Sequence, residues 1–410
     1  MKKKKRTNDC KTACMLGLFP YDTDVRVQNY VNPLTKVGFS VDIIGQGKED
    51  YSTTMENGTV VSVFTIGERV KKDKHKIFYL WDYMHFLVLS MFKVARLHFR
   101  KKYRFIHVHN PPDFLVFATW IPRLFGAKII LDIHDILPEF YARKFGVDMN
   151  SKLTRGLLHL EKASCGFANH VIVANDVWRN TLIKRSVEEK KCTSVINFVD
   201  RDLFSPKGRV GSEKKNGCFT IIYHGSCTEH HGLDVAIKAI ELLKDRISSL
   251  KFLIYGEGYY LETVKNLIVS KGLERLIEMR EFVPIVEVPR ILNEADIGVV
   301  PKKDGLFVGE ALSTKLFQYV AMGIPAVVSR TVAEKRYFDE DEVKFFTPDD
   351  PEDMARKIYE YYQNPQERAV FAQRALNRMD LDNYTIESSA KVYLGLVDTI
   401  CRKPLNQSRG

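Results

Sequence analysis

Two series of short apolar segments, separated by segments of helical periodicity, run along this chain and limit its fold more than any other feature. The expected strands of the first series are 12–18, 40–44, 60–64, 105–108, 128–133, 170–174 and 194–196. Those of the second are 219–224, 251–255, 277–279, 297–300, 326–328 and 343–346. Alternating strands and helices are typical of parallel sheets covered by helices on both faces. We therefore predict an α/β protein with two Rossmann-like, doubly wound parallel-sheet domains.

The domain boundaries follow from length and from one linker-like stretch. A chain of 410 residues exceeds what one hydrophobic core usually serves. Residues 205–217 are rich in Gly, Lys and Ser and have no apolar period, which indicates a linker. We expect an N-terminal domain over 1–207, a C-terminal domain over 208–384, and a final helix and tail over 385–410. Open α/β sheets bind ligands at the carboxyl ends of their strands, so we expect the domains to face one another across a cleft.

Charge is distributed unevenly between the two halves. Residues 1–207 carry 34 Lys and Arg against 21 Asp and Glu, whereas residues 208–410 carry 28 against 30. A basic half suits nucleic acid, anionic lipid or a phosphorylated substrate, and a solvated basic surface remains an alternative. Because no helix-turn-helix, zinc or aromatic-basic signature accompanies the charge, nucleic acid is the weakest of these partners.

The sequence indicates a cytoplasmic protein. Its basic start is not followed by the apolar run of a signal peptide. The most apolar stretch, 77–97, is interrupted by Asp82, His85 and Lys93 and falls short of the roughly 18 apolar residues of a spanning helix. Seven cysteines show no metal-type pairing, so we expect reduced thiols and no metal site.

Polar residues follow three expected strands of the first half. His107 and His109 alternate on one strand and therefore point to the same face, with His109 at the carboxyl end. His134 follows the next strand, beside Asp135, for which capping of the following helix is the alternative. The first strand runs into Gly17, which would let backbone approach a ligand, although the G-x-G-x-x-G spacing is missing. His109 and His134 are the predicted site residues, and a structural role is the alternative for His107.

The second half presents a comparable set of candidates for binding a nucleotide. Glycines follow two of its strands, and a Ser-Thr-Lys sequence stands where a helix begins, so free N–H groups and one cation could hold phosphate. An ordinary helix cap is the alternative. The candidates are Gly225, Ser226, His230, His231, Gly256, Ser313, Thr314, Lys315 and Gln318.

Considered together, these segments resemble those of the GT-B retaining glycosyltransferases of family 4, especially bacterial members of polysaccharide assembly. The resemblance rests on segments 22–26, 107–113, 131–139, 223–233, 295–298 and 313–325, in that order. It implies a donor nucleotide held by the second domain, an acceptor held by the first, and transfer of a hexose with retained configuration. The donor would be a UDP- or GDP-linked sugar, the acceptor lipid-linked or a polysaccharide, and no cofactor or metal would be needed.

The resemblance also assigns roles to individual residues. His109 matches the histidine that contacts the donor sugar, and Lys315 the lysine near the diphosphate. Val283, within 282–284, lies in the part that frames the base. Glu310 and Gln318 stand for the family's paired glutamates, which makes Glu310 a catalytic candidate beside His109 and His134.

Three positions depart from the family pattern. Ser226 replaces the usual arginine and His231 the usual lysine, while Gln318 replaces a glutamate. Neutral imidazoles hold a diphosphate less firmly than permanent cations do, and His230 is the neighbouring candidate for that task. Two interpretations therefore stay open: an active hexosyltransferase, or a catalytically weak or inactive GT-B-like subunit that binds a nucleotide sugar or a partner enzyme.

Two basic runs suggest peripheral contact with the inner face of the plasma membrane. The first is Lys2–Arg6, and the second extends from Lys93 to Arg104. The second follows an apolar helix bearing Trp81, Phe86 and Phe92, so apolar anchoring and attraction to anionic lipid could act together. The alternative is that these aromatic residues belong to the domain core. The sequence does not predict an oligomeric state.

Overall fold

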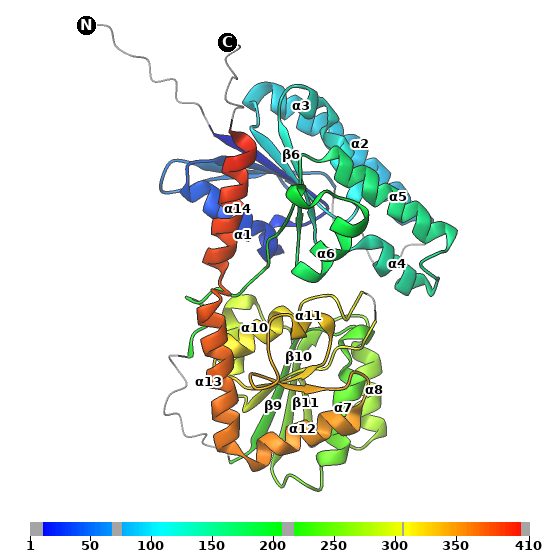
Figure 1. Ribbon diagram of the computed structural model, residues 1–410, viewed down its shortest axis with the longest axis vertical. Coiled ribbons are helices and arrows are strands. Elements are labelled where there is room, and N and C mark those ends of the chain that lie inside the picture. Colours follow the sequence, from blue (N-terminus) through cyan, green and yellow to red (C-terminus); the bar gives the residue numbers. More distant parts are fainter. Residues whose placement is uncertain (1–10, 68–75, 207–216, 306, 403–410) are drawn as a thin grey trace, which may run out of the picture. The chain divides into compact units, whose positions relative to one another are not determined.

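The computed structural model describes residues 11–67, 76–206, 217–305 and 307–402 (Figure 1). The chain divides into two compact units, residues 1–197 with 389–410, and residues 198–388. The division after Asn197 precedes the expected boundary at residue 207, which lies outside the described residues. The final helix returns to the first unit, so that unit is built from both ends of the chain.

The first unit contains one sheet in the order β3-β4-β2-β1-β5-β6-β7-β8. The strands are β1 (Thr12–Leu16), β2 (Ser40–Gly45), β3 (Tyr51–Thr54), β4 (Val60–Thr65), β5 (Phe105–His109), β6 (Lys128–Ile133), β7 (His170–Val173) and β8 (Cys192–Ser194). Neighbouring strands pair in parallel, except that β3 pairs antiparallel with β4. The strand order reverses at β1 and β5, and ligands bind open α/β sheets at the carboxyl ends of such a pair.

Helices cover this sheet. They are α1 (Val25–Lys36), α2 (Lys76–Lys101), α3 (Trp120–Leu124), α4 (Leu137–Phe145), α5 (Lys152–Phe167), α6 (Asp176–Arg185) and, after its first turn, α14 (Ile386–Cys401). Tyr30 and Leu34 of α1 and Tyr393 of α14 pack with Met15 and Phe105 of the sheet in one buried cluster. Because helices cover the sheet, its strands are nearly continuous runs of apolar residues, which is why the sequence predicts them well.

The second unit contains a parallel sheet in the order β11-β10-β9-β12-β13-β14. Its strands are β9 (Phe219–Ser226), β10 (Leu250–Glu257), β11 (Ile277–Arg280), β12 (Ile297–Val300), β13 (Ala326–Ser329) and β14 (Lys344–Phe346). Its helices are α7 (Leu233–Leu243), α8 (Leu261–Ser270), α9 (Val288–Leu292), α10 (Thr314–Ala321), α11 (Val332–Lys335), α12 (Pro351–Gln363) and α13 (Pro365–Leu381). Here the order reverses at β9 and β12. The predicted fold class, two doubly wound parallel sheets, is confirmed.

The edge strand β3 was not predicted from the sequence. All four of its residues are exposed, so it lacks the apolar signal by which the other strands were found. Within the described ranges, no helix combines the length and the apolar character that a membrane span requires.

Candidate functional site

In the first unit, a buried carboxylate collects the polar residues that follow the strands. Asp132, near the end of β6, is paired in register with His109 at the end of β5. Its Oδ1 accepts a hydrogen bond from Arg26 Nη2 at 2.8 Å, and its Oδ2 accepts one from Arg26 Nε at 3.1 Å. His134 Nε2 lies 2.9 Å and His109 Nδ1 lies 3.4 Å from Oδ2. The structure thus brings His109 and His134 together, with their two nearest ring nitrogens 3.1 Å apart.

This cluster combines one anion with two histidines, His107 and His109, whose neutral form is favoured by burial. Burial alone would raise the pKa of Asp132, but Arg26 and the adjacent histidines hold it well below its usual range. Burial also lowers the pKa of His109 and, further, that of His107. His109 Nδ1 and His134 Nε2 both face the Asp132 carboxylate, which accepts hydrogen bonds. His109 Nδ1 is therefore placed to donate a hydrogen bond, and His109 Nε2 is placed to accept one. His109 Nε2, like His107 Nε2, is buried and has no hydrogen-bond partner among the described residues.

His107 and Gly17 complete this part of the site. The His107 ring stacks on His109 with centroids 4.2 Å apart, and its Nδ1 lies 3.0 Å from the Tyr393 hydroxyl of α14. This buried contact supports the structural role that is the alternative for His107. A Cβ on Gly17 would lie 2.5 Å from the Phe19 ring and 3.1 Å from His109 Cβ, so only glycine fits there.

Asn110, which the sequence did not single out, ties the two strand ends together. Its Nδ2 donates to Asp113 Oδ1 at 2.8 Å, and its Oδ1 accepts from the backbone N–H of His134 at 2.6 Å. Asp135 does not cap the next helix, because α4 begins after Ile136 without a side-chain cap. The capping alternative for Asp135 is therefore wrong.

The geometry favours an ion-pair network over a metal site. Ligand atoms of His107, His109 and Asp132 lie within 4.8 Å of one another. However, Arg26 already occupies both oxygens of Asp132, and its positive charge would repel a cation bound beside it. Among the described residues, a second acidic group, Asp200 with Asp202 and Glu387, is partly exposed.

In the second unit, Lys315 lies beside the glycine at the end of β9, and the glycine at the end of β10 packs closely against that same strand end. Gly225, at the end of β9, has a φ of +108°, and a Cβ there would lie 3.6 Å from Lys315 Nζ. A Cβ on Gly256, at the end of β10, would lie 2.3 Å from the carbonyl oxygen of Gly225. Lys315 Nζ lies 5.0 Å from the centre of the Tyr223 ring. The predicted juxtaposition of glycine-bearing strand ends and this lysine is therefore present.

The electrostatics of this region depend on lysines rather than histidines. Burial and the nearby Lys302 lower the pKa of Lys315 to about 8. Burial and Lys315 lower the pKa of His231 to about 2, so this ring is neutral at pH 7. The rings of His230 and His231 both lie within hydrogen-bond reach of Thr228 Oγ1, at 3.1 and 2.9 Å. Lys315 therefore carries the positive charge next to Gly225.

The start of α10 is held by a buried ion pair that was not predicted from the sequence. Lys302, just after β12, lies 2.7 Å from Glu334 Oε1, and the same oxygen accepts the backbone N–H of Ser313 at 3.1 Å. The Ser313 hydroxyl is buried and has no partner among the described residues. The sequence signal that could have identified Lys302 is its position shortly after β12, one of the two strands at which the strand order reverses.

The remaining candidates lie around this helix start and the neighbouring strand ends. Thr314 is exposed at the first position of α10, Gln318 is half-buried one turn later, and Glu310 is half-buried in the preceding turn. Ser226, the last residue of β9, is exposed. Val283 is half-buried in the segment after β11.

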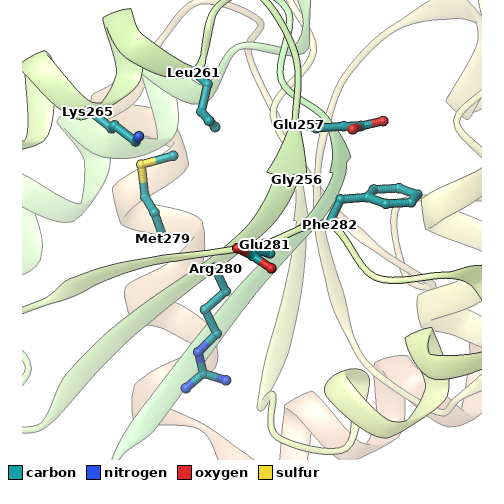
Figure 2. A pocket seen from close by; sticks show the side chains of 8 residues that line it. All are labelled: Gly256, Glu257, Leu261, Lys265, Met279, Arg280, Glu281 and Phe282. Atoms are coloured by element: carbon teal, nitrogen blue, oxygen red, sulfur yellow. The ribbon is translucent and has the colours of Figure 1, made fainter.

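A cavity of about 450 Å³ opens beside Gly256 (Figure 2). Leu261 and Lys265 of α8 lie on one side of it, and Phe282 lies on the other. The described residues that line it are Gly256, Glu257, Leu261, Lys265, Met279, Arg280, Glu281 and Phe282. Arg280 is held by Glu278 at 2.7 Å and by Glu294 at 2.9 Å. Val283, predicted to frame a base, directly follows this lining.

Two family models match nearly consecutive parts of the chain. The model described as Glycosyltransferase Family 4 matches residues 24–203, and that described as Glycosyl transferases group 1 matches residues 205–378. Two curated relatives match shorter parts. An Escherichia coli K12 protein named for colanic acid biosynthesis, the glycosyltransferase WcaL, is 27% identical over 211 residues, 51% of each chain. The amylovoran biosynthesis glycosyltransferase AmsK of Erwinia amylovora is 28% identical over 156 residues, 37% of each chain. The chain thus spans about half or less of these relatives.

Solved structures share the fold over almost the whole chain. Sucrose-phosphate synthase from Thermosynechococcus elongatus has a TM-score of 0.76 at 15% identity, covering 95% of this chain and 99% of that one. Anabaena HepE, solved with UDP-glucose, has a TM-score of 0.70 at 14% identity, with the same two coverages. At such identities the likeness establishes architecture alone. With both family models accounting for residues 24–203 and 205–378, this chain belongs to the family 4 glycosyltransferases of GT-B fold.

Proposed function

We propose that this protein transfers a hexose from a UDP- or GDP-linked donor to a lipid-linked or polysaccharide acceptor, with retention of configuration. The observation that carries the proposal is Lys315, a half-buried cation beside Gly225 with a pKa of about 8. A diphosphate needs positive charge and backbone N–H groups at the point where negative charge develops on the leaving group. Relatives named for colanic acid and amylovoran biosynthesis support a role in polysaccharide assembly.

Each unit has its own task in this proposal. The second unit binds the nucleotide, with Lys315, Ser313 and the first N–H groups of α10 on the diphosphate, and the segment around Val283 at the base. The first unit binds the acceptor and supplies His109 and His134, which position the sugar. His109 Nε2 accepts a hydrogen bond from a sugar hydroxyl, because Asp132 holds the opposite side of the ring. The protein works in the cytoplasm, at the inner face of the plasma membrane.

The alternative is a GT-B-like subunit that binds a nucleotide sugar or a partner enzyme but transfers slowly or not at all. The neutral state of His231 favours it, since this residue stands where the family carries a lysine. Lys302 does not replace that charge, because it is committed to Glu334 at 2.7 Å. Donor binding would then survive better than turnover.

Calorimetry and donor hydrolysis with a panel of UDP- and GDP-sugars test the proposal. We expect one donor to bind and to be turned over, and Lys315→Ala to weaken its binding at least tenfold. Lys238→Ala, which removes an exposed lysine of α7 in the same unit, is the matched control and should leave affinity unchanged. Binding without turnover would establish the alternative. Equal affinities of the two variants would overturn the phosphate assignment.

His109→Ala separates the task of the first unit from that of the second. Because its proposed partner is the sugar in the reacting complex, we expect turnover to fall far more than donor affinity. A loss of affinity equal to the loss of turnover, with a lower melting temperature, would instead show that His109 serves folding.

A further inference from the structure

Helix α2 turns an apolar face to solvent. Trp81, Phe92 and Phe99 are 70%, 65% and 55% exposed. At 100° per residue these three positions lie within about 20° of one line along the helix, and they span about 27 Å. The opposite side of the same helix contributes the buried residues Phe86 and Val94. The interpretation of the α2 aromatic residues as core therefore holds for one face only.

Helix α3 extends this surface. Trp120, Leu124 and Phe125, at and just after α3, are also exposed. The ring of Phe125 contacts that of Phe99 with centroids 4.9 Å apart, and the two helices are in contact. Both helices lie on the outside of the sheet of the first unit (Figure 1). The α2–α3 face consists of Trp81, Met84, Val88, Leu89, Phe92, Phe99, Trp120, Leu124 and Phe125.

Positive charge borders the α2–α3 face. Arg96 and Arg100 are exposed, and helix geometry places them about 40° and 80° around α2 from Phe92. Neither has a carboxylate partner among the described residues. Arg123 of α3 is also exposed, with its guanidinium 4.5 Å from the centre of the Phe167 ring. Acidic residues are nearly absent from both helices, since α3 has none and α2 has only Asp82.

The basic run expected from the sequence divides in the structure. Lys93 and Lys101 turn away from this surface, to Asp50 at 3.4 Å and to Asp42 at 2.7 Å. The basic segment Lys2–Arg6 lies outside the described residues. Among the described residues, Arg96 and Arg100 of α2 and Arg123 of α3 are exposed cations beside the apolar face.

We infer that the α2–α3 face docks on an anionic lipid bilayer, with α2 lying in the plane of the interface. A contiguous exposed apolar surface marks an interaction site, and monomers rarely expose a large one. Tryptophan favours the boundary between headgroups and acyl chains, and a basic border favours anionic lipid over neutral lipid. The arginines without carboxylate partners and the scarcity of acidic residues thus favour a partner with a negatively charged surface and an apolar interior, as an anionic bilayer has. This docking does not require that the protein transfers sugar.

The native protein provides the first test. Trp81 and Trp120 lie on the face, while the third tryptophan, Trp178, is 3% exposed. Phosphatidylglycerol vesicles should shift the emission to shorter wavelength and allow quenching by brominated acyl chains, and added salt should weaken both effects. Phosphatidylcholine vesicles should give little change. Equal responses to both lipids at any salt concentration, or none to either, would overturn the inference.

Variants test the two components separately by co-sedimentation. Each cation near an anionic surface is worth about 1 kcal/mol, so Arg96→Gln with Arg100→Gln should weaken the partition coefficient about 30-fold. Trp81→Ser with Phe92→Ser should also weaken it. Leu381→Ser, at a site 79% exposed in the second unit, is the matched apolar control and should bind vesicles as the native protein does.

Two further measurements separate lipid docking from loss of donor binding and from self-association. Donor affinity of the variants should stay native, which keeps failure of docking separate from failure of the proposed transfer. In lipid-free solution, sedimentation velocity should show the same oligomeric state for the native protein and Trp81→Ser with Phe92→Ser. A self-associated native protein that the variant dissociates, without vesicle binding by either, would assign the face to a second copy of the chain and overturn the inference.

Discussion

Replacing Asp132 by asparagine tests the buried network of the first unit most directly. The substitution keeps the shape of the side chain but removes the charge that faces Arg26, whose side chain is only 12% exposed. It leaves a buried guanidinium without its counter-charge and the nearby histidines without their anion. Removing one partner of a buried ion pair costs about 3–5 kcal/mol of stability. Since Arg26 keeps some contact with water, we expect a loss of about 3 kcal/mol.

Tryptophan fluorescence during urea unfolding measures this loss in the correct unit. All three tryptophans, Trp81, Trp120 and Trp178, belong to the first unit. Asp50→Asn is the matched control, because Asp50 is 48% exposed and lies 3.4 Å from Lys93. An exposed pair of this kind contributes less than about 1 kcal/mol.

Two further results bear on the same reasoning. Adding Arg26→Met to Asp132→Asn should recover part of the lost stability, because the uncompensated cation is then gone. The folded state lowers the pKa of Asp132, so its contribution to the free energy of unfolding is complete above the pKa of the unfolded state, about 3.9. This contribution is lost as pH falls through the lower pKa of the folded state. A loss for Asp132→Asn no larger than that for Asp50→Asn would refute the buried ion pair.

Three other outcomes are expected. Donor affinity, measured by calorimetry, should fall as pH rises through about 8, where Lys315 loses its proton. Lys315→Arg should abolish this decline, and a native affinity that does not change with pH would contradict the assignment of Lys315 to the diphosphate. Gly232→Ala should cost more than about 3 kcal/mol in unfolding followed by circular dichroism, because the new Cβ would lie 1.7 Å from a carbonyl oxygen. Gly272→Ala, at a similar φ of +62° but with open space, should cost about 1–2 kcal/mol, and equal losses would refute the clash. Burial lowers the pKa of His107 and His109, so the urea midpoint of the first unit should decrease as pH falls from about 6.5 to 5; a constant midpoint would contradict this.

The sequence predicted the two sheets because their strands are buried runs of apolar residues. Such runs can be recognised without knowing which strands pair with one another. It also placed His109 near His134, since the carboxyl ends of parallel strands share one edge of the sheet. The same rule placed Gly225 and Gly256 near one another. These predictions used local pattern and one topological rule.

The sequence did not predict that Arg26, Asp132 and Tyr393 meet in the first-unit cluster. Arg26 and Asp132 are 106 positions apart in the chain, and no periodicity relates them. Tyr393 meets His107 only because the chain returns to the first unit after residue 388. The sequence also did not predict whether Trp81 lies on the buried or the exposed face of α2, because this helix has apolar residues on both sides.

The return of α14 to the first unit has a consequence for biosynthesis. Tyr393 is fully buried and belongs to the same cluster as Met15 and Tyr30, from the beginning of the chain. A ribosome adds roughly 5–20 residues per second, so synthesis of residues 198–388 separates the two ends of this core by about 10–40 s. During that interval the surface that α14 covers faces water, and the first unit acquires its complete core only after the second has been synthesised.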